Sequence, residues 1–274
     1  MKKIGIIVNR EKDADLSFTE SIGNWLDSRG CTAVILDGEI IKPGASYDFL
    51  ICLGGDGTIL HAAGKSALYD IPLLGINLGN VGYLTDANKS EAFKSLERVL
   101  NGEFALEKRM MLNADLTAYG RSKINPALNE IHLSRGTSNM IRIKVWINDD
   151  YIDAYRCDGI LISTPTGSTA YNLSAGGPIL KPDGNMIAIT PVCPHALYTR
   201  PFVVSADDAV KIQIIESGMS DVILHTDGIN IIELKSNDSV TITRSEYRAT
   251  IIKTNNYGFY DILRRKILRA GGGV

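Results

Sequence analysis

The chain has 274 residues, 45% of them hydrophobic, with 29 basic and 31 acidic side chains. This composition excludes a disulfide-stapled miniature protein and a disordered chain, because it can bury the core of one long domain or two ordinary ones. A formal net charge of −2 lacks the basic excess that drives binding to nucleic acids or anionic membranes. We therefore expect small-molecule partners, and neither nucleic acid nor a membrane.

The longest uncharged stretch, residues 159–180, is long enough to span a membrane but is crowded with Ser, Thr, Gly, Pro and Asn. Hydrocarbon would leave their polar groups unsatisfied, so no membrane helix is predicted there. The apolar run at residues 4–8 is too short for a secretory signal peptide. These features predict a cytoplasmic protein. They also predict free thiols, because no C-x-x-C pair or zinc-type spacing occurs among Cys31, Cys52, Cys157 and Cys193.

Short β-rich runs alternate with helical patterns over the first hundred residues. This alternation predicts an α/β domain with a wound parallel sheet. Strands are expected at residues 3–8, 32–36, 49–53 and 71–77. Helices are expected at residues 16–28, 59–68 and 90–100. Gly102 is placed as a C-terminal stop for the last of these helices, so the first domain is predicted to span residues 1–104.

Beyond residue 104 the hydrophobic period changes from 3.6 to 2. The change is clearest in Ile141–Ile147, and it recurs at residues 210–214 and 240–243. Such alternation is typical of antiparallel strands with one exposed face. Residues 105–254 are therefore predicted to form an all-β, sandwich-like domain. The pattern then becomes helical again, and we expect residues 255–274 to form a tail that packs on the first domain.

The segment Gly54-Gly55-Asp56-Gly57-Thr58 lies between a predicted buried strand and a predicted helix. Such a junction offers unpaired backbone N–H groups and the positive end of the helix dipole to an anion. The segment matches neither G-x-G-x-x-G nor G-x-x-x-x-G-K-[ST]. A carboxylate among phosphate-binding amides would repel the ligand unless it acts as a base or meets a metal ion, so Asp56 indicates catalysis. The alternative is a tight turn in which Asp56 caps the helix.

This glycine loop resembles the GGDGT motif of NAD kinases, of diacylglycerol and sphingosine kinases and, more distantly, of phosphofructokinases. That superfamily transfers the terminal phosphate of ATP to an alcohol. Three further segments resemble the NAD kinases in identity, order and spacing. They are GINLGNVGYLT at residues 75–85, the pair Asn129-Glu130, and residues 158–178 with the run STPTGSTAY. From residue 3 to about residue 268, the chain is similar to bacterial-type NAD kinases.

The resemblance implies a reaction and its participants. The γ-phosphoryl group of ATP would pass to the 2′-hydroxyl of the adenosine ribose of NAD, with Asp56 as the catalytic general base, to give NADP. Mg²⁺ or another divalent cation would accompany ATP, and no metal ligand is assigned in the chain. A homodimer or homotetramer is also implied. The residues leave open whether polyphosphate replaces ATP and whether NADH is accepted beside NAD.

The resemblance also implies which residues bind the substrates. Asn129 and Glu130 would hold ribose hydroxyls, because an amide and a carboxylate together donate to and accept from a diol. Asp158 would accept from the ribose of the nicotinamide half, with Arg156 nearby for charge balance. The all-β domain would hold NAD, and catalysis is expected in the cleft between the domains. The expected binding residues are Gly54, Gly55, Gly57, Thr58, His61, Tyr83, Asn129, Glu130, Arg156, Asp158, Thr166, Thr169, Ala170, Tyr171, Asn172, Leu173, Ser174 and Asp227.

Other functional classes make different demands on the chain. A lipid kinase of the diacylglycerol type would share the glycine loop, but it would need a membrane anchor that the sequence lacks. A non-catalytic regulator that binds NAD would keep residues 163–174 and would not need Asp56. As plain sequence, that Ser/Thr-rich segment also fits a loop that caps a short helix. A serine hydrolase is excluded, because no G-x-S-x-G motif occurs.

Overall fold

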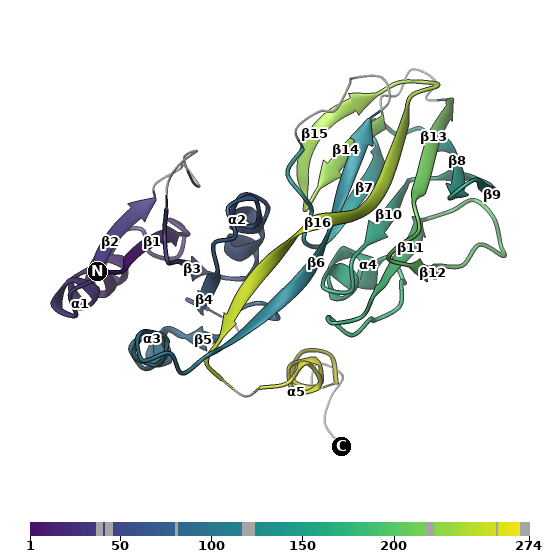
Figure 1. Ribbon diagram of the computed structural model, residues 1–274. Coiled ribbons are helices and arrows are strands. Elements are labelled where there is room, and N and C mark those ends of the chain that lie inside the picture. The colour runs from purple at the N-terminus through teal and green to yellow at the C-terminus, as the bar shows by residue number, and fades with distance from the viewer. Residues whose placement is uncertain are drawn as a thin grey trace. The chain divides into compact units, whose positions relative to one another are not determined.

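The computed structural model describes residues 1–36, 41, 46–79, 82–116, 124–216, 222–255 and 257–268 (Figure 1). The chain divides into two compact units, the first with residues 1–108 and 249–274 and the second with residues 109–248. Strands β6 (Ala105–Leu116) and β16 (Ser239–Lys253) each run from one unit into the other. The boundaries predicted from the sequence lie at the first-unit ends of these strands. Hydrophobic alternation continues along a strand even where the strand changes unit, so it does not mark the division.

The first unit is built on a mostly parallel sheet. Its strand order is β2-β1-β3-β4-β16, with β5 paired to β4. Strands β1 to β4 pair in parallel, and β16 pairs in parallel with β4 through Ile251 and Leu73. The strands are β1 (Lys3–Val8), β2 (Thr32–Leu36), β3 (Phe49–Gly54), β4 (Leu73–Asn77) and β5 (Ala87–Asn88). The helical elements are α1 (Ser17–Ser28), α2 (Asp56–Leu68), η1 (Lys89–Glu91), α3 (Ala92–Leu100), α5 (Phe259–Leu263) and the π-helical turn η3 (Arg264–Leu268).

Helices α1 and α3 cover one face of this sheet, and α2 covers the other (Figure 1). The side chains of Ile22 and Leu96, from α1 and α3, share a buried cluster with Ile51 of the sheet. On the other face Ile59 of α2 lies against Gly75, where a β-carbon would collide with the isoleucine side chain. The absence of a side chain at Gly75 therefore lets α2 pack closely on the sheet, and this packing fixes the helix N-terminus beside the carboxyl ends of β3 and β4.

The second unit contains two antiparallel sheets that enclose one core. One sheet has the order β12-β11-β10-β7-β14-β15, and the other has the order β16-β13-β8-β9, with β6 paired to β16. Ile131 and Ile160 of the first sheet share a buried cluster with Ile143 and Ile212 of the second. This arrangement confirms the sandwich-like domain predicted from the alternation. Its remaining elements are β7 (Glu130–Arg135), β8 (Ile141–Ile147), β9 (Asp150–Cys157), β10 (Gly159–Ser163), η2 (Gly167–Thr169), α4 (Tyr171–Ser174), β11 (Met186–Val192), β12 (Phe202–Ser205), β13 (Val210–Glu216), β14 (Val222–Thr226) and β15 (Ile229–Leu234).

The C-terminal tail returns to the first unit, as predicted, and Asn255 donates its side-chain amide to the Asp86 carbonyl at 2.8 Å. The end of β16 and the residue after it make similar contacts. The Lys253 ammonium donates to the carbonyl oxygens of Leu84 and Thr85 at 3.2 and 3.1 Å. The backbone N–H of Thr254 donates to Asp86 at 2.9 Å. Among the described residues, none of the helices has the length and apolar character that crossing a membrane requires.

Candidate active site

The glycine loop connects the fully buried strand β3 to helix α2. The helix begins at Asp56, three residues before the predicted start at Ile59, because the extended Gly55 already serves as its N-cap. A β-carbon at Gly54 would collide with the Thr58 side chain, whereas one at Gly57 would meet no atom within 4 Å. Gly54 is therefore needed for packing, and the surface at Gly57 is open to a ligand. Thr58 itself is buried, and its hydroxyl accepts a 3.4 Å hydrogen bond from the Gly55 N–H.

The Asp56 carboxylate is surrounded by hydrogen-bond donors. One oxygen accepts from the backbone N–H of Tyr83 at 2.7 Å, and the other accepts from those of Leu84 and Thr85 at 3.0 and 3.4 Å. A β-carbon at Gly82 would collide with this carboxylate, so the close approach depends on glycine at that position. The two family-like segments, GGDGT and GINLGNVGYLT, are thereby joined through one side chain; Asn80 and Val81 lie outside the described residues.

Two lysines that the sequence analysis did not single out lie beside this loop. The Lys266 ammonium is 3.8 Å from Asp56 Oδ2 and 4.5 Å from the centre of the Tyr83 ring. The Lys12 ammonium lies 3.2 Å from the position that a β-carbon on Gly55 would take and 3.6 Å from the same position on Gly79. Isolated lysines carry no spacing signal, so only the fold could reveal them. Together they place positive charge where an anion would meet the loop amides.

Two other predicted residues of the first unit differ in their surroundings. Tyr83 is half-buried, donates its backbone N–H to Asp56 and lies under Lys266. His61 is exposed on α2, one turn after Gly57. No hydrogen bond or ion pair joins its ring to Asp56 in the part of the chain that the structure describes. The structure therefore brings Tyr83, but not His61, into the Asp56 cluster.

In the second unit, Asp227 holds the segment that carries Asn129 and Glu130. Its carboxylate accepts from the backbone N–H groups of Leu128 at 2.7 Å, Asn129 at 2.7 Å and Glu130 at 3.1 Å. Burial raises the pKa of Asp227 to about 6, although these three hydrogen bonds act in the opposite direction. Asp227 and Gly228 have φ of 51° and 79°, and they form the two-residue turn between β14 and β15. Asp227 was predicted to contact a ligand, but in the structure its carboxylate holds the backbone of residues 128–130 in place.

Glu130 begins strand β7 and is only 7% exposed. Burial, followed by the nearby charge of Asp227, raises the pKa of Glu130 to about 8. Its Oε2 atom and the hydroxyl of Thr166 are buried without a hydrogen-bond partner in the described part of the chain. The two residues flank one junction, because Ser163 pairs with Glu130 across the strands and the Thr164 N–H donates to the Asn129 carbonyl. A buried polar atom without a partner in the chain needs one from outside it, and water or a ligand can supply that partner.

Some residues of the Ser/Thr-rich segment 163–174 are buried and make internal contacts, whereas others are exposed. Gly167 lies against the Asn129 backbone, where a β-carbon would collide. Asn172 is fully buried, and its amide bonds the Ser168 and Pro178 carbonyls and the Thr190 hydroxyl. Asn172 is therefore a structural anchor, which the resemblance did not indicate. Of the predicted binding residues in this segment, the partly or fully exposed ones are Thr169, Ala170, Tyr171, Leu173 and Ser174.

The charge partner of Asp158 differs from the prediction. Asp158 pairs with Arg135 at 3.1 Å, and not with Arg156. Arg156 is exposed on β9 and lies opposite Arg142 in the strand register, and β9 ends at Cys157, so Asp158 is not part of that strand. Arg135, at the other end of β7 from Glu130, carried no motif in the sequence.

An aromatic cluster on the same sheet also went unpredicted. His132 stacks on His225 with ring centres 5.2 Å apart, and Tyr171 meets His132 edge-on at 5.2 Å. Burial, together with the neighbouring His225, lowers the pKa of His132 to about 4, so this imidazole is neutral at pH 7. Tyr171 is 43% exposed and so retains an open ring surface. The cluster supports Tyr171 beside Glu130, which lies two residues before His132 on the same strand.

The described residues contain no group of three His, Cys, Asp or Glu side chains placed to hold a metal ion. Mg²⁺ in phosphoryl-transfer enzymes is held by one or two carboxylates together with substrate phosphates and water, so it does not need such a group. The residues of the first unit therefore fit a metal ion that arrives with a nucleotide as part of the substrate. The described residues of this unit do not form a separate metal cage.

Each unit has one feature that suits a nucleotide-dependent phosphotransferase: the first has a helix N-terminus beside a carboxylate, and the second has buried polar atoms that can accept from hydroxyl groups. The ATP-NAD kinase N-terminal domain model matches residues 41–104, and the ATP-NAD kinase C-terminal domain model matches residues 128–254. The chain is 44% identical over 283 residues to the NAD kinase of Caldanaerobacter subterraneus subsp. tengcongensis, covering 97% of this chain and 99% of the relative. It is 38% identical over 285 residues to the NAD kinase of Acetivibrio thermocellus, covering 99% of each.

Two solved structures resemble the fold over almost the whole chain. An NAD kinase from Archaeoglobus fulgidus in complex with ATP has a TM-score of 0.78 at 26% identity and covers 97% of this chain and 98% of that chain. The yeast NADH kinase complexed with NADH has a TM-score of 0.81 at 23% identity and covers 100% and 89%. The chain belongs to the NAD kinase family and is a kinase. Neither the lipid kinase nor the non-catalytic regulator is supported.

Proposed function

We propose that this chain transfers the γ-phosphoryl group of ATP to the 2′-hydroxyl of the adenosine ribose of NAD, giving NADP and ADP. The observation that carries the NAD half is the pair of orphaned acceptors, Glu130 Oε2 and the Thr166 hydroxyl, in a buried junction held by Asp227. A ribose diol supplies hydroxyl donors to a carboxylate, and an amide such as Asn129 can bond the same diol. Tyr171, supported by His132, offers a ring face for stacking.

The first unit supports the phosphoryl-donor half of the proposal. The α2 N-terminus at Gly55 and the open surface at Gly57 suit an approaching phosphate, and Lys12 adds positive charge beside the loop. Phosphoryl transfer asks a protein mainly for positioning and charge neutralisation. Asp56 would accept the proton of the attacking hydroxyl at Oδ2, which accepts one backbone hydrogen bond whereas Oδ1 accepts two. ATP would bind as its Mg²⁺ complex, in which the ion neutralises phosphate charge.

The resemblance further supports a cytoplasmic homodimer or homotetramer. Leu197 and Tyr198 in the second unit are 85% and 90% exposed, and apolar residues of this kind are suited to contacts between subunits. Sedimentation equilibrium of the purified chain would measure the assembly directly. A concentration-independent monomer would contradict this part of the proposal.

The reaction is tested by incubating the full chain with MgATP and NAD, and then separating the nucleotides chromatographically. We expect NADP and ADP to form in equal amounts. Neither product should form when EDTA removes Mg²⁺. Parallel incubations replace NAD with NADH or diacylglycerol, and ATP with polyphosphate. ADP formation that needs diacylglycerol, or the absence of NADP with every donor, would overturn the proposal.

A further inference from the structure

The last described turn of the chain reaches the Asp56 carboxylate. Lys266 lies in the π-helical turn that follows α5, and its ammonium is 3.8 Å from Asp56 Oδ2. The same ammonium lies over the Tyr83 ring at 4.5 Å. An aromatic face and a carboxylate together aim a flexible lysine side chain at one place, because both attract a cation. The backbone N–H of Tyr83 also donates to Asp56 Oδ2, so an amide and the ammonium face the same oxygen.

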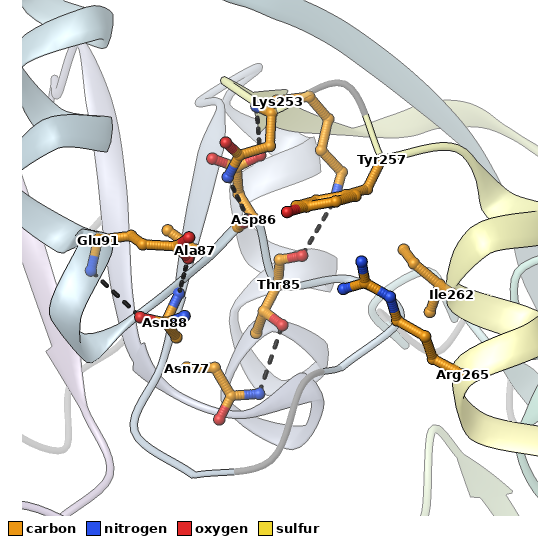
Figure 2. Close-up of a pocket in the computed structure, with 11 residues that line it drawn as sticks. Asn77, Thr85, Asp86, Ala87, Asn88, Glu91, Lys253, Tyr257, Ile262 and Arg265 are labelled. Atoms are coloured by element: carbon orange, nitrogen blue, oxygen red, sulfur yellow. Dashed lines mark hydrogen bonds between the residues drawn. The ribbon is translucent and has the colours of Figure 1, made fainter. Parts of the chain in front are cut away.

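The neighbouring cations of the tail are directed elsewhere. Arg264 is 3.8 Å from Asp261 within the same helical segment. Arg265 stacks over the Tyr257 ring at 4.6 Å and lines a small pocket with Thr85 and Lys253 (Figure 2). Of these three consecutive basic residues, Lys266 is the one that contacts Asp56 within the described part of the chain. This difference provides a matched control within one turn of the chain.

The Lys266–Asp56 ion pair is expected to contribute little to the folding stability of the chain. The two side chains are 33% and 32% exposed, and ion pairs that remain partly hydrated contribute little to folding. An ammonium has three N–H donors, and a single contact with Asp56 leaves donors for a second acceptor. The position of the Lys266 ammonium is more important for catalysis than for stability. Negative charge on the transferring phosphoryl group develops next to the group that receives the hydroxyl proton, which is Asp56 in the proposed reaction.

We propose that Lys266 bridges Asp56 and the γ-phosphoryl group of the donor during transfer, so that the C-terminal tail completes the catalytic site. This inference rests on the proposed function. The O–H bond of the acceptor breaks and its proton passes to Asp56. The acceptor oxygen forms the new O–P bond, and the bond between the γ-phosphorus and the bridging oxygen breaks with its electron pair leaving on ADP. Lys266 stays protonated and neutralises phosphoryl charge throughout.

The test compares Lys266→Met with Lys266→Arg and with the control Arg264→Met. Steady-state formation of NADP gives kcat and separate KM values for ATP and NAD, and a titration without ATP gives the Kd of NAD. We expect Lys266→Met to lower kcat by roughly 10²- to 10³-fold, the effect of removing one donor to developing charge, and to raise KM for ATP. Lys266→Arg should restore part of kcat, whereas the Kd of NAD should stay unchanged in all three variants. Arg264→Met should remain within a few-fold of the parent chain.

Several outcomes would overturn the inference. One is a kcat and a KM for ATP in Lys266→Met that stay within a few-fold of the parent values. Another is an equal loss in Lys266→Met and Lys266→Arg with a lowered melting temperature and weaker NAD binding, which would show a purely structural role. If Lys266→Met fails to fold, Lys266→Gln takes its place, and the comparison with Lys266→Arg decides. An inactive parent chain would instead contradict the proposed function, so the two failures are distinguishable.

Discussion

At the scale of single residues, Asp56 combines a chemical role with a structural one. We predict that Asp56→Asn lowers kcat for NADP formation by roughly 10²- to 10⁴-fold, the range for a positioned general base. An asparagine side chain has one acceptor oxygen and an NH₂ group that would face backbone N–H donors. Leaving one such donor unsatisfied costs about 1–3 kcal/mol, so the melting temperature should also fall. Steady-state kinetics and thermal melts of both proteins measure the two effects.

The control for Asp56→Asn is Glu20→Gln on the exposed surface of α1. It should change neither the kinetics nor the melting temperature. A kcat for Asp56→Asn that stays near the parent value, with only the melting temperature lowered, would limit Asp56 to holding residues 83–85.

The raised pKa of Glu130 makes NAD binding depend on pH. In the unliganded fold the carboxyl group is mostly neutral below pH 8 and ionised above it, because its pKa is raised to about 8. Since the ionised group is the stronger acceptor for ribose hydroxyls, NAD should bind more tightly at pH 9 than at pH 6. Glu130→Gln should remove this dependence. At pH 9 the variant should bind NAD about ten- to a hundredfold more weakly than the parent. At pH 6 the Kd values of the two proteins should be much closer to each other.

Calorimetric titration of NAD at the two pH values measures this effect. The exposed Glu233 of β15 offers the matched control Glu233→Gln, which should follow the parent curve. The folding stability should move in the opposite direction to the affinity. A group whose pKa is raised on folding contributes stability that is lost as the pH rises from about 4.5 to about 8. Parallel pH curves for the parent and Glu130→Gln would remove Glu130 from the NAD site.

At the scale of elements, the β3–α2 junction separates packing from binding. We predict that Gly57→Val raises KM for ATP with little change in stability, because its side chain would enter open space in front of the loop amides. Gly54→Ala should instead lower the melting temperature, because the new β-carbon would collide with Thr58. Kinetics and melts of the two variants test the contrast. Equal destabilisation by both would show that the Gly57 surface is packed.

The β14–β15 turn acts on NAD binding through the segment that it holds. Asp227→Asn would leave at least one of the three N–H groups of residues 128–130 without an acceptor. We predict a melting temperature lower than that of the parent and a raised Kd for NAD, with KM for ATP nearly unchanged. Titration of NAD and steady-state kinetics with ATP separate these quantities. A raised KM for ATP with an unchanged Kd for NAD would contradict the positioning role.

At the scale of the whole molecule, each unit has its own buried core, one among α1, α3 and the parallel sheet and one between the two antiparallel sheets. A ligand that binds only the folded state stabilises what it contacts, by about 2.7 kcal/mol at a hundred times its Kd. We therefore predict that NAD slows amide hydrogen exchange most in residues 128–135 and 158–174. MgATP should slow it most in residues 54–58 and 82–85. Hydrogen-exchange mass spectrometry with each ligand alone measures both patterns. Protection of residues 54–58 and 82–85 by NAD, and of residues 128–135 and 158–174 by MgATP, would contradict the proposed binding regions.

The sequence by itself determined the elements and the family resemblance. Periods of 3.6 and 2 arise because each helix or strand buries one face, and this information lies within a few residues of the chain. For that reason Ile141–Ile147 was found with its observed bounds, and the glycine loop was placed between a strand and a helix. The start of α2 was misplaced by three residues, because glycine disfavours a helix locally while packing of Ile59 on Gly75 favours it.

Only the tertiary structure decided the partners of the candidate site residues. The hydrogen-bond donors to Asp56 come from residues 83–85, its ion-pair partner is Lys266, and Asp227 accepts from residues 128–130. Arg135 takes the place predicted for Arg156, and Asn172 is an anchor rather than an open surface. These pairings join segments far apart in the sequence, and they depend on strand order and register, which no local period encodes. The sequence therefore predicted which residues belong to the candidate site. The contacts that each of these side chains makes could be known only from the tertiary structure.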